Sequence, residues 1–247
     1  MIGTTKNCFW RLCLGVLSFG PMLGAENKVE TAEAAWGQLI GEAAAKHPAY
    51  AYVENRPELP NVFIYGDSIS IGYTAGVRTR LASQANVYRL HQNGGDSGSF
   101  AAKFEKLEST MRDARLTGSW GFQWDVIQFN VGLHDLKFVD AKGKLDLQDG
   151  TQVASVETYT RNLRQIIGLL KAAAPEAKLI FALTTHVPPD SAGRIEGSET
   201  AYNAAARRVL ADFPEIEVND LQEASLPYMQ VGNVHFKPDG IQAQAEH

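Results

Sequence analysis

The sequence predicts an α/β protein built as a three-layer α/β/α sandwich. Apolar runs of strand length alternate with segments of helical periodicity along most of the chain. Strands that alternate with helices pair in parallel through right-handed crossovers, which place helices on both faces of the sheet. With 247 residues, 45% of them hydrophobic and 21% charged, the chain can bury a sizeable core. This composition excludes the disordered and fibrous classes.

Five apolar runs are the expected strands of one parallel sheet. The first reads NVFIY and stops at Gly66, as expected for a strand buried on both faces. The five runs are Asn61–Tyr65, Asn86–Leu90, Trp124–Phe129, Lys178–Thr184 and Ile216–Val218.

Helices are expected before the first strand and between the strands. An Ala-rich helix over Thr31–His47 precedes a loop marked by Pro57 and Pro60, and Pro175 and Pro214 stop two later helices. The later helical patterns cover residues 69–83, 100–112, 156–174 and 198–213. Residues 137–150 are polar and strand-poor, so they are expected to form an excursion over the top of the sheet.

The first 25 residues have the order of a secretory signal peptide. Lys6 and Arg11 precede an apolar run over residues 12–19, and Gly24 and Ala25 precede the polar Glu26. The run is too short to span a bilayer, and a buried N-terminal helix is the alternative. We therefore expect a signal peptide over 1–25, a helix with a proline-containing lead-in over 26–60, one domain over 61–247, and a periplasmic or secreted protein.

Export would change the charge and the cysteine content. Cys8 and Cys13 both lie in the first 25 residues, so the exported chain would have no disulfide, thiolate metal site or cysteine nucleophile. Loss of Lys6 and Arg11 would change the formal net charge from −5 to −7. This charge gives no reason to expect nucleic acid or an anionic membrane surface as a partner, and no stable membrane insertion is expected after cleavage.

The candidate chemistry lies where strands end, because ligands of open parallel sheets bind at the carboxyl ends of the strands. Gly66, Asp67 and Ser68 follow the first strand directly and precede a helix. The Ser68 hydroxyl would then stand above the sheet, with its N–H at a helix N-terminus that stabilises negative charge. A purely structural Asp/Ser N-cap is the alternative. A serine nucleophile needs a base, and His235, in the loop after the last strand, could reach the same edge.

Four segments together resemble the SGNH (GDSL-type) hydrolases. They occur in the family's order on the predicted α/β pattern, and the resemblance covers residue 61 to the C-terminus. The segments are Gly66–Ser68, Asn93–Ser97, Asn130–Asp135 and Val234–Gly240. The resemblance implies a flavodoxin-like sandwich and a serine ester hydrolase that needs no cofactor or metal. The Walker, dinucleotide-binding and zinc-protease motifs are also absent from the sequence.

The resemblance also implies a role for individual residues. Ser68 would be the nucleophile and His235 the general base. The oxyanion hole would use the backbone N–H groups of Ser68 and Gly95 and the side chain of His134. His134 replaces the usual asparagine of the third segment, and a surface-loop histidine is the alternative.

The acid that usually stands three residues before the histidine is missing, because that position is Gly232. Asn233 or a backbone carbonyl could accept the Nδ1 proton of His235 instead, which would leave a Ser-His centre of reduced basicity. Gly232→Asp is then expected to raise activity. Asp67 and Asn130 are further candidates for support, and His186, expected near the end of the fourth strand, is a candidate for substrate binding or a solvated loop residue.

The sequence thus predicts an exported serine esterase that removes small acyl groups, such as acetyl, from a carbohydrate. Its partner would be an acyl ester or an acylated glycan, and no nucleic acid. A lysophospholipase or thioesterase of the same family, or a non-catalytic glycan-binding module, is the alternative.

Overall fold

One parallel five-stranded sheet forms the centre of the molecule in the computed structural model, which describes residues 1–2 and 30–247. All neighbouring strands pair in parallel, in the order β2-β1-β3-β6-β7. These strands are β1 (Asn61–Tyr65), β2 (Asn86–Arg89), β3 (Val126–Phe129), β6 (Lys178–Ala182) and β7 (Glu217–Asn219). The predicted fold class is confirmed, whereas residues 3–25 of the predicted signal peptide lie outside the described residues.

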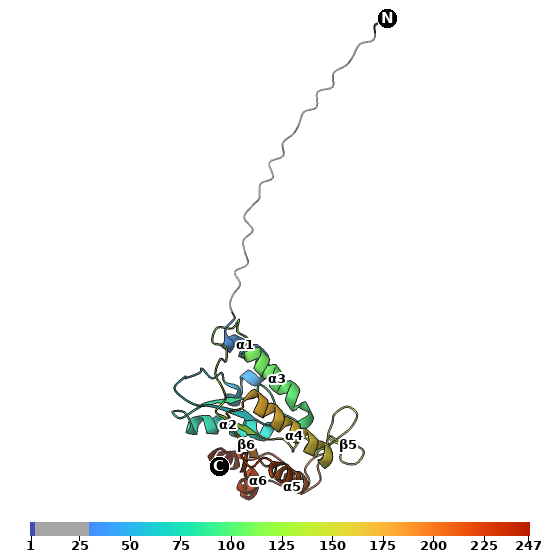
Figure 1. Cartoon of the computed structure of the whole chain (residues 1–247). Helices are drawn as coiled ribbons and strands as arrows, with labels where there is room; N and C mark the ends of the chain where they lie inside the picture. Colours follow the sequence, from blue (N-terminus) through green and yellow to red (C-terminus); the bar gives the residue numbers. More distant parts are fainter. Residues whose placement is uncertain (3–29) are drawn as a thin grey trace.

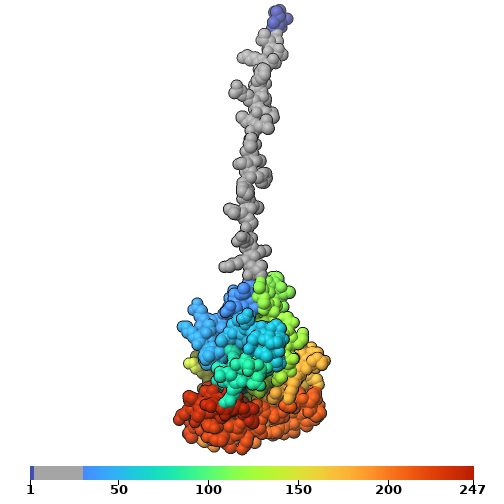
Figure 2. Space-filling model, turned by 90° about the vertical axis from the view of Figure 1, so that its left-hand side faces the viewer, coloured from blue at the N-terminus to red at the C-terminus, as the bar shows by residue number. Residues whose placement is uncertain are grey.

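Helices cover both faces of this sheet. On one face α2 packs against α7, and on the other α4 packs against α3 and α5 (Figure 1). Figure 2 shows the C-terminal residues, in red, directly against the blue-green residues, in agreement with the contact between α7 and α2. The helices are α1 (Ala32–Ala45), α2 (Ser68–Arg80), α3 (Phe100–Met111), α4 (Val156–Ala173), α5 (Glu199–Leu210), α6 (Leu221–Ser225) and α7 (Pro238–Glu246). Three short 3-10 turns lie at Pro48–Tyr50, Ser97–Ser99 and Leu226–Tyr228.

The elements differ from the sequence prediction mainly at their ends. The last strand is shifted by one residue, since Ile216 is buried just outside the ladder. The excursion over residues 137–150 is not free of strands, because β4 (Phe138–Val139) pairs antiparallel with β5 (Thr151–Gln152). Phe138 also donates its N–H to the Gly193 carbonyl at 2.7 Å, which ties the excursion to the loop after β6.

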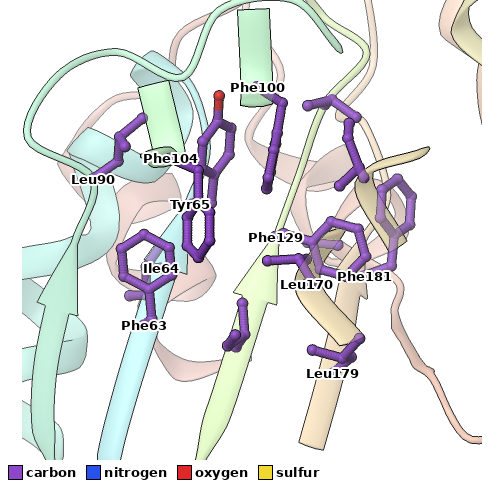
Figure 3. Packing of buried hydrophobic residues seen from close by; sticks show 14 of the residues in the cluster. Phe63, Ile64, Tyr65, Leu90, Phe100, Phe104, Phe129, Leu170, Leu179 and Phe181 are labelled. Atoms are coloured by element: carbon purple, nitrogen blue, oxygen red, sulfur yellow. The ribbon is translucent and has the colours of Figure 1, made fainter. Parts of the chain in front are cut away.

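Aromatic side chains fill the space between the sheet and the helices. Phe63 stacks on Trp124 with ring centroids 5.0 Å apart, and Tyr65 packs against Phe100. Figure 3 shows the Tyr65 hydroxyl beyond the end of its strand. This hydroxyl donates to the Gly94 carbonyl at 3.0 Å, so the buried core directly holds a loop at the carboxyl edge of the sheet.

His91, just after β2, is a buried histidine held in its neutral form. The residue is 5% exposed, and the side-chain amide of Gln92 donates to its Nε2 at 3.0 Å. Nδ1 therefore carries the proton and is buried without a hydrogen-bond partner. Burial, aided by Lys106 and Lys103, lowers the pKa of His91 to about 4.

This lowered pKa predicts acid sensitivity of the fold. Because the unfolded histidine takes up a proton near pH 6.5 and the folded one only near pH 4, stability present above pH 6.5 is lost progressively as the pH falls from 6.5 to 4. His91→Phe keeps an aromatic ring that cannot be protonated. We expect the unfolding free energy of the wild type, relative to that of this variant, to fall by about 2 kcal/mol between pH 7 and 4. Denaturant titrations at several pH values measure it, and parallel pH curves would contradict it.

Candidate active site

Ser68 is the first residue of α2, directly after β1. Asp67 caps this helix, because its Oδ1 accepts the N–H of Ile69 at 2.9 Å. The capping role therefore belongs to the aspartate, and the Ser68 hydroxyl is left to make another contact. That contact is with His235, whose Nε2 lies 2.9 Å from Ser68 Oγ across 167 residues of sequence.

The loop before α7 brings His235 to Ser68. Gly232 donates its N–H to the Pro189 carbonyl at 2.8 Å, and the Gln230 amide donates to the His235 carbonyl at 2.9 Å. The packing of α7 on α2 then brings the C-terminal segment against the helix that begins at Ser68. His235 is solvent-exposed and Ser68 half-buried, so a substrate can reach both.

Asn233 determines which nitrogen of His235 carries the proton. Its Oδ1 lies 2.9 Å from the backbone N of His235 and 3.0 Å from Nδ1 of the same residue. A backbone N–H can only donate, so the facing atom of Asn233 must be the oxygen, and Nδ1 must be the protonated ring nitrogen. Nε2 is then unprotonated and accepts the hydrogen of the Ser68 hydroxyl.

Among the described residues, no carboxylate takes the place of the missing acid. Asp220 pairs with Arg207, and Asp239 accepts the N–H of Gly240, so neither contacts His235. Gly232 has φ +74°, a left-handed conformation that side chains disfavour. An aspartate at 232 would therefore be strained and would compete for a ring nitrogen that Asn233 already holds, which makes position 233 the better place to test the missing charge.

A glycine allows the loop after β2 to approach the Gly66 backbone closely, two residues before Ser68. Gly94 donates its N–H to the Gly66 carbonyl at 2.9 Å, and a Cβ at Gly94 would lie 2.7 Å from that oxygen. Gly95 follows with φ +70°. Its N–H, an expected oxyanion donor, donates to Asn93 Oδ1 at 2.9 Å, a contact that sequence reasoning missed.

His134 is held by Lys137, a residue that sequence reasoning also missed. The ammonium Nζ of Lys137 lies 3.2 Å from His134 Nδ1. An ammonium group only donates, so Nδ1 accepts and Nε2 carries the proton. Burial lowers the pKa of His134; Asp67 opposes this shift, whereas Lys137 and Arg194 add to it. The neutral ring can therefore offer an Nε2–H donor. In the sequence, the one indication of this contact is a lysine three residues after the histidine.

Asp135 ties the two expected oxyanion loops together. Its fully buried carboxylate accepts the Ser97 N–H at 3.1 Å and the Ser97 hydroxyl at 2.5 Å. Burial raises the pKa of Asp135 to about 6, although both Ser97 hydrogen bonds act to lower it. This contact holds the loop of His134 against the loop of Gly95.

The remaining candidates do not contact the Ser68–His235 pair. Asn130 donates its amide to the Ala182 carbonyl at 2.6 Å and so joins the ends of β3 and β6. His186 Nδ1 lies 2.8 Å from the fully buried carboxylate of Glu199, which anchors the ring beyond the end of β6. A substrate-binding role of His186 stays a prediction.

Within residues 1–2 and 30–247, no group of three or more His, Cys, Asp or Glu side chains is arranged to hold a metal ion. In the same residues no helix has the length and apolar character needed to cross a membrane.

Comparison with known proteins gives one family and a shared fold. The GDSL-like Lipase/Acylhydrolase family matches residues 64–243, which contain all four sequence segments. No curated protein matches the chain.

Solved structures also resemble this chain. A candidate GDSL-like lipase from Parabacteroides merdae has a TM-score of 0.57 and 18% identity over 79% of this chain and 96% of its own. The acetylxylan esterase Axe2 from Geobacillus stearothermophilus has a TM-score of 0.55 and 14% identity over 76% and 91% of the two chains. The acetyl xylan esterase AlAXEase has a TM-score of 0.55 and 16% identity over 75% and 96%. At these identities the likeness establishes the fold.

The contact with His235 predicts that Ser68 is the activated serine of this chain. A fluorophosphonate should label Ser68, and His235→Gln should slow labelling by at least about a hundredfold, since general-base assistance is lost. Peptide mass spectrometry locates the label. Ser70→Ala is a matched control that should be labelled at the wild-type rate, because the Ser70 hydroxyl in the same helix donates to the Asp67 carbonyl and does not contact His235. Labelling of His235→Gln at the wild-type rate would show that the contact does not activate Ser68.

Proposed function

Because the chain belongs to the GDSL-like lipase/acylhydrolase family, we propose that Ser68 and His235 hydrolyse esters of small acyl groups, with acetyl on a carbohydrate as the favoured substrate. Family membership confirms the enzyme class expected from the motifs, a serine ester hydrolase. The 2.9 Å contact between Ser68 Oγ and His235 Nε2 is the observation that carries the catalytic proposal.

The proposed reaction begins with proton transfer from Ser68 to His235. Ser68 Oγ attacks the ester carbonyl carbon while Nε2 takes the hydroxyl proton, and the carbonyl oxygen becomes an oxyanion. The protonated His235 then gives this proton to the departing alcohol oxygen as the ester C–O bond breaks. Water attacks the resulting acyl-enzyme, again with His235 as base, and releases the carboxylic acid and the free serine.

Three N–H groups are the proposed donors to the oxyanion. The N–H of Ser68 points from the N-terminus of α2, and the neutral His134 ring offers Nε2–H. The Gly95 N–H joins them when it leaves Asn93 Oδ1 for the more negative oxygen of the intermediate. Asn233 acts as a positioning residue, since it selects the tautomer of His235 without supplying negative charge.

Substrate and location are further parts of the proposal. Two of the similar structures are acetylxylan esterases, which favours acetyl groups on a glycan over the lipid or thioester alternatives. The Ser68–His235 hydrogen bond favours catalysis over a non-catalytic glycan-binding module. Export through the predicted signal peptide would bring the enzyme to such polymers outside the cell.

A 4-nitrophenyl ester series tests this function. We expect kcat/KM to decrease from acetate to octanoate, release of acetic acid from acetylated xylan, and a loss of at least about a thousandfold in Ser68→Ala. Equal rates for wild type and Ser68→Ala would remove the catalytic proposal. Faster hydrolysis of octanoate would support the lipid alternative, and xylan binding without turnover the glycan-binding module.

Because Asn233 is neutral, we expect that replacing its amide by a carboxylate raises kcat. Asn233→Asp keeps the acceptor but makes it a carboxylate, and a charge-assisted hydrogen bond to the imidazolium is stronger by about 1.4 kcal/mol. We expect kcat for 4-nitrophenyl acetate to rise about tenfold, and Asn233→Leu to lower it by at least as much. Asp239→Asn, which changes a charge near His235 without touching the ring, serves as control. A lower kcat in Asn233→Asp would contradict the positioning role.

A further inference from the structure

Two half-buried lysines contact the two loops expected to bind the oxyanion. Lys103, on α3, donates from Nζ to the carbonyls of Asn93 and Gly94 at 3.0 and 2.9 Å. A Cβ built at the neighbouring Gly95 would lie 2.7 Å from this Nζ. Lys137 Nζ contacts His134 Nδ1 at 3.2 Å and has two further ammonium hydrogens.

A third cation joins them from the loop after β6. Arg194 is half-buried and donates from Nε to the carbonyl of Leu133, the residue before His134, at 3.2 Å. Its Nη1 donates to the Ala192 carbonyl, which leaves Nη2 for another acceptor. Lys103, Lys137 and Arg194 are called the cationic cluster below.

The cationic cluster is not neutralised by ion pairs. In the described part of the chain, none of its three side chains has a carboxylate oxygen within 4.0 Å, whereas eight other pairs meet this limit. The nearby carboxylates are instead used by backbone N–H groups. Asp96 accepts from Ser99, as Asp67 and Asp135 accept from Ile69 and Ser97.

The members of the cationic cluster are close enough to repel one another. After burial, the charge of Arg194 is the next largest cause that lowers the pKa of Lys137, and Lys137 in turn lowers the pKa of Lys103. Asp96 opposes both shifts, and on Lys103 its effect is larger than that of Lys137. The chain as a whole has a formal net charge of −5, so the sign of the cationic cluster is opposite to that of the whole chain. An anion bound among the three would relieve their repulsion.

The geometry points to an anion subsite beside the oxyanion loops. Resting on the proposed function, we infer that the cationic cluster binds a carboxylate or sulfate on the same glycan that carries the acetyl ester. The enzyme would then act on an acidic polysaccharide rather than on a neutral one. Arg194 would supply directed N–H donors from its planar guanidinium, and Lys137 a compact positive charge.

A pair of substrates that differ only in charge tests this inference. O-acetylated oligogalacturonides carry the carboxylate, and methyl esterification removes its charge without removing the acetyl groups. We expect the wild type to have at least a tenfold higher kcat/KM for acetate release from the charged oligomers at low salt. Arg194→Gln and Lys137→Met should each lower this ratio several-fold. Because both substrates share the same chemistry, any damage to His134 cancels in the ratio.

Lys178→Met is the matched control, since this exposed lysine lies at the start of β6, away from the carboxyl ends of the strands, where it pairs with Glu217. It should leave the ratio unchanged. Inhibition of 4-nitrophenyl acetate hydrolysis by galacturonate, galactose 6-sulfate and galactose distinguishes carboxylate from sulfate recognition.

Two results would overturn the anion subsite. One is an equal kcat/KM of the wild type for charged and methylated oligomers. The other is a charge preference that Arg194→Gln and Lys137→Met both retain. Ser68-dependent hydrolysis of 4-nitrophenyl acetate would in either case leave the proposed function standing. If no ester is hydrolysed, calorimetry of charged and methylated oligomers with the wild type and Arg194→Gln gives the same decision from binding alone.

Discussion

The hydrogen bond between Ser68 Oγ and His235 Nε2 is the contact on which the proposed chemistry of this protein depends. It joins the first turn of α2 to the loop before α7, and the packing of these two helices holds its ends together. Asn233 gives the contact its direction, because it keeps the proton on Nδ1 and leaves Nε2 to accept. Loss of the α2–α7 packing would therefore separate Ser68 from His235 even with both side chains present.

The surrounding loops are held by the hydrophobic core and by buried polar contacts. Tyr65 extends from the core to the Gly94 carbonyl, and Gly94 in turn binds the Gly66 carbonyl. Asp135 accepts two hydrogen bonds from Ser97 and so joins the loop of His134 to the loop of Gly95. Because these contacts are buried, the loops that carry the donors expected to face an oxyanion are ordered before substrate arrives. Of these donors, the Gly95 N–H still has to exchange its partner, Asn93 Oδ1.

The charged side chains around Ser68 and His235 face in different directions. The carboxylates Asp67 and Asp135 face inward toward backbone N–H groups, and the position that would face His235 holds a neutral amide. The cationic cluster contacts the oxyanion loops and has no carboxylate partner within ion-pair distance among the described residues. The inferred anion subsite rests on these cations without ion-pair partners and on the neutral amide beside His235.

The sequence by itself determined the α/β sandwich, the position of Ser68 after β1 and the family, because apolar periodicity and short motifs are local properties of the chain. It also indicated His235, through a motif rather than through any visible contact. Only the tertiary structure decided that Asn233 contacts His235 Nδ1 in place of an acid, which the chain lacks at position 232. It also decided that Asn93 accepts the Gly95 N–H and that Lys137 donates to His134. Such contacts depend on side-chain direction and on distances of about 3 Å, and these are set by packing between segments that lie far apart in sequence.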